Sequence, residues 1–404
     1  MKLYSIKKSL KGNPGIGFCI VFSIIVFYAT FVLFNGQMIL FHNGNASEYL
    51  SDLPSHVWFA INGTGYGLVS LLLRYSYYLG GDYGVAFLLS TISVLTLWVA
   101  ATLLLKLIKW TNRESEISYV TAFLISAPVV FIGSMYLPRF YNVMYILNTS
   151  AGRLSTDFTQ PWHNSTYLAM KASGTLAVII FFSIDRHYLK RLTLKEWIVF
   201  TLSLTLVNAA KPNFFVAFAP AMLCFLIYDF IRLKGHGTLQ MIKFGSAVLC
   251  SMPILFIDAM ILYPQDGGSG VTITTQYFEN AIKEGWFFPY LIAGSSFVIM
   301  VSAICILKKK TNRIFWFGWL SYLFSFLERW FIWETGSRAS HGNFSWGVKF
   351  FAFLLTIICI ERLIYMRKTI NRSVLYLAIL LLVFMVMSGV AFFISQSQGM
   401  SYWW

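Results

Sequence analysis

The sequence predicts an all-α, polytopic membrane protein with about eleven transmembrane helices. Of its 404 residues, 57% are hydrophobic and only 12% are charged, which excludes an ordinary soluble globular protein. Apolar runs long enough to cross a bilayer follow one another along the chain, and no stretch with the composition of a soluble domain separates them. Residues 1–404 are therefore expected to form a single transmembrane domain in a lipid bilayer.

Each expected transmembrane helix corresponds to an apolar run of about 20 residues. The first run follows a lysine-rich segment and has no convincing small-residue cleavage site, so we interpret it as a retained helix rather than a signal peptide. Two runs between residues 196 and 232 predict a tight helical hairpin. In chain order, the runs begin near Ile16, Tyr83, Tyr119, Thr166, Glu196, Asn213, Phe244, Phe287, Ile314, Gly347 and Val374.

The distribution of basic residues predicts the orientation. The formal net charge is +15, which can indicate a nucleic-acid partner, but the basic residues fall in short clusters between apolar runs, so no nucleic acid is expected. The positive-inside rule places these clusters in the cytoplasm, with the N-terminus, and the C-terminus outside. They hold 22 of the 31 Lys and Arg residues and comprise the N-terminus and residues 106–113, 186–195, 232–243, 308–313 and 362–372.

The first outer loop, residues 35–82, contains the stretch "SDLPSH". Ser51 or Asp52 is suited to cap a short interfacial helix that has Pro54 in its first turn, and His56 then lies on the same face as Asp52. One interpretation is structural, with Asp52 as a helix cap and His56 as an interfacial polar residue. The other is catalytic, with Asp52 as a general base and His56 binding an acceptor or an anionic head group. Glu48 is the alternative acid.

A tyrosine-rich segment, "GYGLVSLLLRYSYYLGGDYG", follows this stretch and predicts a second interfacial helix in which Arg74 snorkels to the membrane surface. Beyond it, three cations lie at the outer ends of spans, namely Lys171, Lys211 in "NAAKPNFF", and Arg329. A charge inside a membrane costs about 3 kcal/mol, so each needs a partner or a purpose. Asp258 is a candidate partner for Arg329. Each cation alone is explained by a structural ion pair or by snorkelling, whereas together they favour an anion site.

The outer segment "ERWFIWETGSRASHGNFSW" places Arg338 three residues before His341. The planar guanidinium of Arg matches the geometry of a phosphate group, and His can donate a hydrogen bond beside it. A phosphate-binding loop is therefore one interpretation of this segment, and a polar loop with solvated charges is the other. The sequence contains no P-loop, HExxH or CxxC motif in a usable context, so ATP-driven chemistry and zinc hydrolysis are not expected.

The "SDLPSH" acid before an interfacial helix, the tyrosine-rich segment after it, and "AAKPNFF" at the outer turn of a later hairpin together resemble the GT-C superfamily of membrane glycosyltransferases. The bacterial members that decorate cell-surface polysaccharides are the most similar. The resemblance implies a GT-C-like fold in the bacterial cytoplasmic membrane and transfer of a sugar from a polyprenyl-phosphate carrier to a polysaccharide or glycolipid outside. It also implies that Asp52 is the base and that Lys211 and Arg338 hold the lipid phosphate, a role that extends to Lys171 and Arg329.

The chain departs from many GT-C relatives because it lacks a paired acidic motif and a large C-terminal outer domain. No cofactor and no metal ligands are predicted, and a divalent metal remains compatible with the sequence. Two further function classes stay open. A transporter or lipid-linked oligosaccharide flippase would carry broken helices at the membrane midplane and inverted repeats, which we do not find. A polysaccharide polymerase or an acyltransferase would use similar outer arginines and a histidine.

Overall fold

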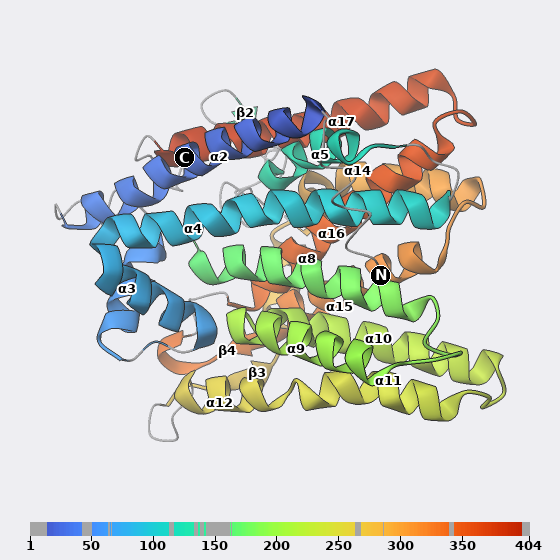
Figure 1. Ribbon diagram of the computed structural model, residues 1–404, viewed down its shortest axis with the longest axis horizontal. Helices are drawn as coiled ribbons and strands as arrows, with labels where there is room; N and C mark the ends of the chain where they lie inside the picture. The colour runs from blue at the N-terminus through green and yellow to red at the C-terminus, as the bar shows by residue number, and fades with distance from the viewer. Residues whose placement is uncertain are drawn as a thin grey trace.

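A computed structural model gives the arrangement of the chain and describes residues 14–42, 51–63, 65, 67–112, 117–132, 136–137, 141–142, 162, 164–262, 268–285, 287–338 and 343–397. The described residues are mainly helical, and the long helices lie side by side along one common direction (Figure 1). The expected all-α architecture is confirmed. The strands are short and form two antiparallel pairs, β1 (Tyr136–Leu137) with β2 (Tyr141–Asn142) and β3 (Val271–Ile273) with β4 (Ile332–Glu334).

Six of the described helical segments are long and apolar enough to cross a membrane. They are Gly15–Ile39, Gly67–Thr111, Ser165–Asp185, Asn213–Arg232, Thr238–Leu262 and Arg372–Ile394. The helices are α2 (Pro14–His42), α3 (Leu53–Ile61), α4 (Gly67–Thr111), α5 (Tyr119–Ser126), α8 (Ser165–Asp185), α9 (Leu194–Ala210), α10 (Asn213–Arg232), α11 (Thr238–Cys250), α12 (Pro253–Leu262), α13 (Gln276–Lys283), α14 (Phe287–Leu307), α15 (Arg313–Phe331), α16 (Trp346–Met366) and α17 (Arg372–Ser397).

A sharp break divides α4 into a shorter first part and a longer second part. Gly80 and Gly81 have non-helical backbone angles, and Gly81 has a φ of +57°, which glycine adopts without the strain that a Cβ would add. The break separates the tyrosine-rich segment from the long apolar run, where two distinct helices are expected from the sequence. The short helix α3 lies at the same end of the bundle as the start of α4 (Figure 1).

Helix α16 lies at the centre of the bundle. It packs against α4, α8, α10, α14 and α15, and most of its residues are buried. An aromatic cluster joins the neighbouring helices, because the ring of Phe181 in α8 lies 4.4 Å from the ring of Phe317 in α15 and 5.1 Å from that of Phe218 in α10. The expected hairpin is present as α9 and α10, with Lys211 and Pro212 between them.

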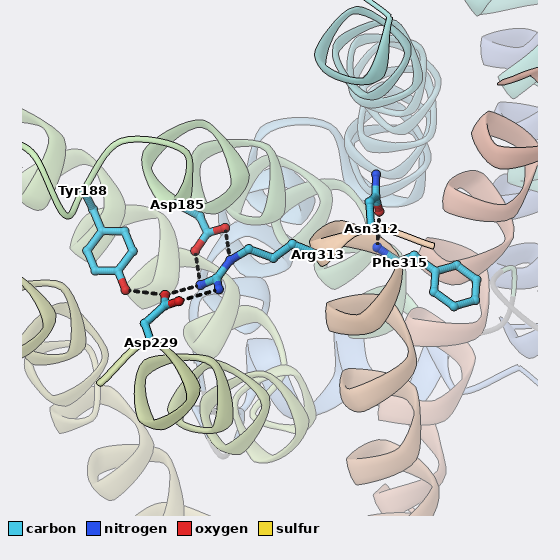
Figure 2. A network of polar contacts seen from close by, with 6 residues as sticks. All are labelled: Asp185, Tyr188, Asp229, Asn312, Arg313 and Phe315. Carbon is cyan, nitrogen blue, oxygen red and sulfur yellow. Dashed lines mark hydrogen bonds and ion pairs between the residues drawn. The ribbon is translucent and has the colours of Figure 1, made fainter. Parts of the chain in front are cut away.

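An ion-pair network holds α8, α10 and α15 together at one end of the bundle (Figure 2). Arg313 donates two hydrogen bonds of 2.8 Å to the carboxylate of Asp185 and bonds of 2.7 and 3.0 Å to that of Asp229. Tyr188 donates a further bond of 2.7 Å to Asp229. Such bidentate pairing fixes both distance and orientation, so the network sets how these helix ends meet.

Candidate functional site

At the end of the bundle opposite this network, four segments meet: α3, the start of α8, the turn between α9 and α10, and the segment from the end of α15 through β4 into α16. Figure 1 shows α3 and β4 at this end. Polar and charged side chains from all four segments contact one another there, and we call them the outer cluster. Its residues are Asp52, His56, Asn164, Ser165, Thr166, Lys211, Asn213, Glu328, Glu334, Arg338, Asn343 and Lys349.

Asp52 occupies the N-cap position of α3, but its side chain makes no capping hydrogen bond. The Oγ of Ser51 instead accepts a hydrogen bond from the Leu53 amide, at 3.1 Å. The carboxylate of Asp52 turns toward α8 and accepts a bond of 2.8 Å from the Nδ2 of Asn164. The interpretation of Asp52 as a helix cap therefore does not fit the structure, because its side chain makes no capping hydrogen bond.

The first residues of α8 bind three charged or titratable side chains of the outer cluster. Asn164 caps α8 by accepting a bond from the Tyr167 amide through Oδ1, which leaves its Nδ2 for Asp52. The Oγ of Ser165 lies 2.7 Å from the Nδ1 of His56, and the Oγ1 of Thr166 accepts a bond of 2.9 Å from the Nζ of Lys211. Sequence analysis missed these three residues, although "NST" before an apolar run is a recognisable cap pattern.

Lys211 ends α9 with an extended backbone and is only 4% exposed. Burial lowers the pKa of its ammonium to about 7, because the charged form loses its water. The Asp52 carboxylate opposes this shift, so Asp52 and Lys211 interact electrostatically. An ammonium with this pKa gains charge when an anion binds beside it.

His56 contributes no positive charge to the outer cluster near neutral pH. Burial lowers the pKa of its imidazole to about 4; the nearby Asp52 carboxylate acts against this shift and Lys211 reinforces it. The ring is therefore neutral and acts through hydrogen bonds. An electrostatic role for His56 toward an anionic head group does not fit this environment, whereas a polar contact with an acceptor does.

A second lysine, absent from the sequence-based candidates, lies beside Lys211. The Nζ of Lys349 in α16 lies 3.9 Å from the centroid of the Trp346 ring, and the Nζ of Lys211 lies 4.8 Å from the same centroid. Lys349 is 6% exposed and lowers the pKa of Lys211, as a neighbouring cation does. Its position within an apolar run could have identified Lys349 from the sequence, because a charge inside a membrane is costly and indicates a functional site.

Arg338 lies in the outer cluster and is held by a carboxylate. Its Nε donates a bond of 2.8 Å to Glu334, which also accepts a bond of 2.7 Å from Asn343. Glu328 is buried nearby and accepts a bond from Asn213, while its second oxygen, Oε2, has no hydrogen-bond partner. The outer cluster therefore contains both cations and carboxylates. One of its buried carboxylate oxygens, the Oε2 of Glu328, accepts no hydrogen bond.

Two of the predicted phosphate ligands lie apart from the outer cluster. Lys171 donates a bond of 2.7 Å to the Val130 carbonyl and lies against the ring of Phe353. Phe353 follows Trp346 by two helical turns, so Lys171 lies about 10 Å deeper along the bundle than Lys211. Arg329 donates a bond of 2.8 Å to Tyr277 and stacks on its ring.

The proposed partner of Arg329 is not Asp258, because the Oδ2 of Asp258 is buried without a hydrogen-bond partner and Asp258 lies instead near the start of α4, beside Gly67. That expectation was wrong, since Arg329 contacts Tyr277 whereas Asp258 lies beside Gly67. Glu48 and His341, the remaining predicted site residues, lie outside the residues that the structure describes. Within the described ranges, no three His, Cys, Asp or Glu side chains gather in a way that could hold a metal ion.

Compared with models of known protein families, with curated proteins and with solved structures, the chain matches none of them. The function proposed below therefore depends on the chemistry of the outer cluster and on the resemblance described above.

Gly347 is expected to be required for the packing of the outer cluster. A Cβ on Gly347 would collide with the Oε2 of Glu328 and lie 3.3 Å from the carbonyl of Asn213. Gly347→Ala should lower the free energy of unfolding by about 1 kcal/mol, the lower end of the cost of overpacking, because the carboxylate end of Glu328 can shift away from the added methyl group. The measurement is thermal unfolding of the purified protein. Gly36→Ala is the control, because nothing lies within 4 Å of that added methyl group, and equal stability of the two variants would contradict the expected clash.

Proposed function

We propose that the protein is a membrane glycosyltransferase that moves a sugar from a polyprenyl-phosphate carrier to a polysaccharide or glycolipid acceptor. The observation that carries this proposal is the meeting of an acid and a cation at the start of α8. Asn164 holds the carboxylate of Asp52, and Thr166, two residues later, holds the ammonium of Lys211. A base and an anion-binding group are the two functions that transfer from a phosphate leaving group needs.

In the proposed reaction, Asp52 accepts the proton of the acceptor hydroxyl as its oxygen bonds to the anomeric carbon of the sugar. The bond between that carbon and the phosphate oxygen breaks, and the polyprenyl phosphate leaves with the bonding electrons. Lys211 and Lys349 stabilise the charge that develops on the leaving phosphate. Arg338 contributes to the same positive field while paired with Glu334. Asn164 is proposed to keep the Asp52 carboxylate oriented toward the acceptor.

The membrane arrangement that we propose has about eleven transmembrane helices, a GT-C-like fold and the outer cluster at the outer face of a bacterial cytoplasmic membrane. The basic connections lie at the opposite end, which supports an N-terminus in the cytoplasm and a C-terminus outside. The outer cluster then lies where the phosphate of a lipid-linked donor meets water, since the polyprenyl tail stays in the bilayer.

The composition of the surface polysaccharide in a strain that lacks the gene tests this proposal. We expect loss of one sugar from an otherwise intact polymer, restored by the wild-type gene. Loss of the whole polymer would instead support a flippase or a polymerase. An unchanged sugar composition would contradict a role in glycosyl transfer to the surface.

The pKa of Lys211 predicts a pH dependence for donor binding. Below pH 7 the ammonium is charged in the free enzyme, so the KM for the donor should be constant. Above pH 7 donor binding must be coupled to proton uptake, because the phosphate favours the charged lysine, and the KM should rise by up to about tenfold per pH unit. In Lys211→Arg the guanidinium stays charged and the KM should stay flat. The same rise in both proteins would show that another group titrates.

A further inference from the structure

The end of the bundle opposite the outer cluster contains a cavity of about 620 Å³. It lies between the ends of α4, α8, α10, α15 and α16, beside the ion-pair network of Figure 2. Two carboxylates, those of Asp185 and Asp229, line it, and Arg313 forms bidentate bonds to both, so its single positive charge offsets one of their two negative charges. The cations that line the cavity are Arg186, Arg232, Lys309, Lys310, Arg313 and Arg362.

Two of these cations, Arg313 and Arg362, are held in place by bonds to neighbouring residues. Arg313 binds its two carboxylates, and Arg362, which is 2% exposed, pairs with Glu361 and donates bonds to the Oγ1 of Thr111 and to the Lys310 carbonyl. These bonds fix the shape of the cavity, because they join α4, α16 and the connection before α15. The cavity is thus built on mutually bonded side chains, of which Arg362 is buried and Arg313 is partly exposed.

Three of the remaining cations add positive charge that exceeds the one carboxylate charge left over by Arg313. Arg232, Lys309 and Lys310 form no ion pair with any residue in the described part of the chain. Lys310 lies 5.8 Å from the centroid of the Tyr365 ring, and Arg186 stacks on Trp110 at 5.3 Å. The N-terminus of α15 lines the same cavity through residues 312–314 and adds the positive end of its helix dipole.

We propose that this basic cavity binds one phosphate-bearing group, that of an acidic phospholipid head group or of a soluble phosphate compound. Its volume matches that of small-ligand sites, and its aromatic walls belong to residues at helix ends, where lipid head groups lie. The positive-inside rule requires basic residues at this end but does not require them to converge on one cavity. The site is independent of the proposed sugar transfer, because it lies at the other end of the bundle.

The test compares two triple variants of the full chain that lose the same charge. The cavity variant carries Arg232→Gln, Lys309→Gln and Lys310→Gln. The control carries Arg191→Gln, Lys243→Gln and Lys368→Gln, at exposed residues of the same end that do not line the cavity. Each protein is reconstituted in nanodiscs of phosphatidylcholine, with or without phosphatidylglycerol. Native mass spectrometry measures retained phosphatidylglycerol, and thermal unfolding measures the effect of added inorganic pyrophosphate.

We expect the wild type and the control to retain phosphatidylglycerol and the cavity variant to bind it roughly 100-fold more weakly, since each cation near an acidic head group contributes severalfold. Stabilisation by pyrophosphate in phosphatidylcholine alone, lost in the cavity variant, would support the proposal with a soluble phosphate as the ligand. Equal loss of binding in both triple variants would overturn it, because only the overall charge would then matter. Failure of the wild type to bind either probe would also overturn it.

Discussion

Asp52→Asn is expected to lower sugar transfer by a factor of about 100 to 10,000, the range over which a general base contributes to catalysis. Asparagine has nearly the same shape and can still accept the hydrogen bond from Asn164, so the fold should be preserved. It cannot accept a proton at neutral pH. The measurement is recovery of the missing surface sugar when a deletion strain is complemented with the variant gene.

Asp82→Asn is the matched control for this variant. Asp82 is another acid of the predicted first outer loop, but it lies 3.2 Å from the Nε2 of His42 in an exposed contact outside the outer cluster. It should restore the surface sugar fully. Full restoration by Asp52→Asn would remove its role as the base, and Glu48→Gln would then test the alternative acid in the same strain.

The largest expected effect on stability comes from Arg313→Met. The change leaves two carboxylates, on Asp185 and Asp229, close together and mostly buried without their cation. Removing one partner of a buried ion pair costs about 3–5 kcal/mol, and we expect the lower end of this range because the Arg313 side chain is 30% exposed. The measurement is thermal unfolding of the purified protein together with its folded yield.

A rescue variant separates the loss of the charge balance from a general defect in packing. Adding Asp185→Asn and Asp229→Asn to Arg313→Met removes the unpaired charges and should restore most of the stability. His42→Asn, at the exposed contact with Asp82, should change the free energy of unfolding by less than about 1 kcal/mol. A triple variant no more stable than Arg313→Met would show that the carboxylates are not the cause.

Much of the helical organisation could be predicted because the bilayer imposes length and apolarity on each helix. The run near Asn213 and the α9–α10 turn at Lys211 appear where the sequence places them. The break in α4 at Gly80 and Gly81 was also predicted, because the sequence separates a tyrosine-rich segment from a long apolar run there. The paired strands β3 and β4 could not be predicted, because residues 271–273 and 332–334 are far apart in the chain and polar-apolar alternation is too short there.

For the site, sequence analysis found the charged groups but not their partners. Asp52 and Lys211 stand out individually because acids and cations are rare in so apolar a chain. Their meeting depends on Asn164 and Thr166, whose types are unremarkable at a helix start, and no local pattern shows which long-range contact such residues make. Lys171 was grouped with Lys211 as a cation near the outer end of a span, but it lies nearly two turns into α8, and its amine bonds the Val130 carbonyl instead.

Binding of polyprenyl phosphate to the purified protein in nanodiscs, measured together with sugar transfer, tests most directly whether the outer cluster combines a base with a phosphate site. We predict that Lys211→Gln loses both binding and transfer, whereas Asp52→Asn keeps binding and loses transfer. Loss of binding in both variants, or binding by neither the variants nor the wild type, would contradict the separation of roles between Asp52 and Lys211.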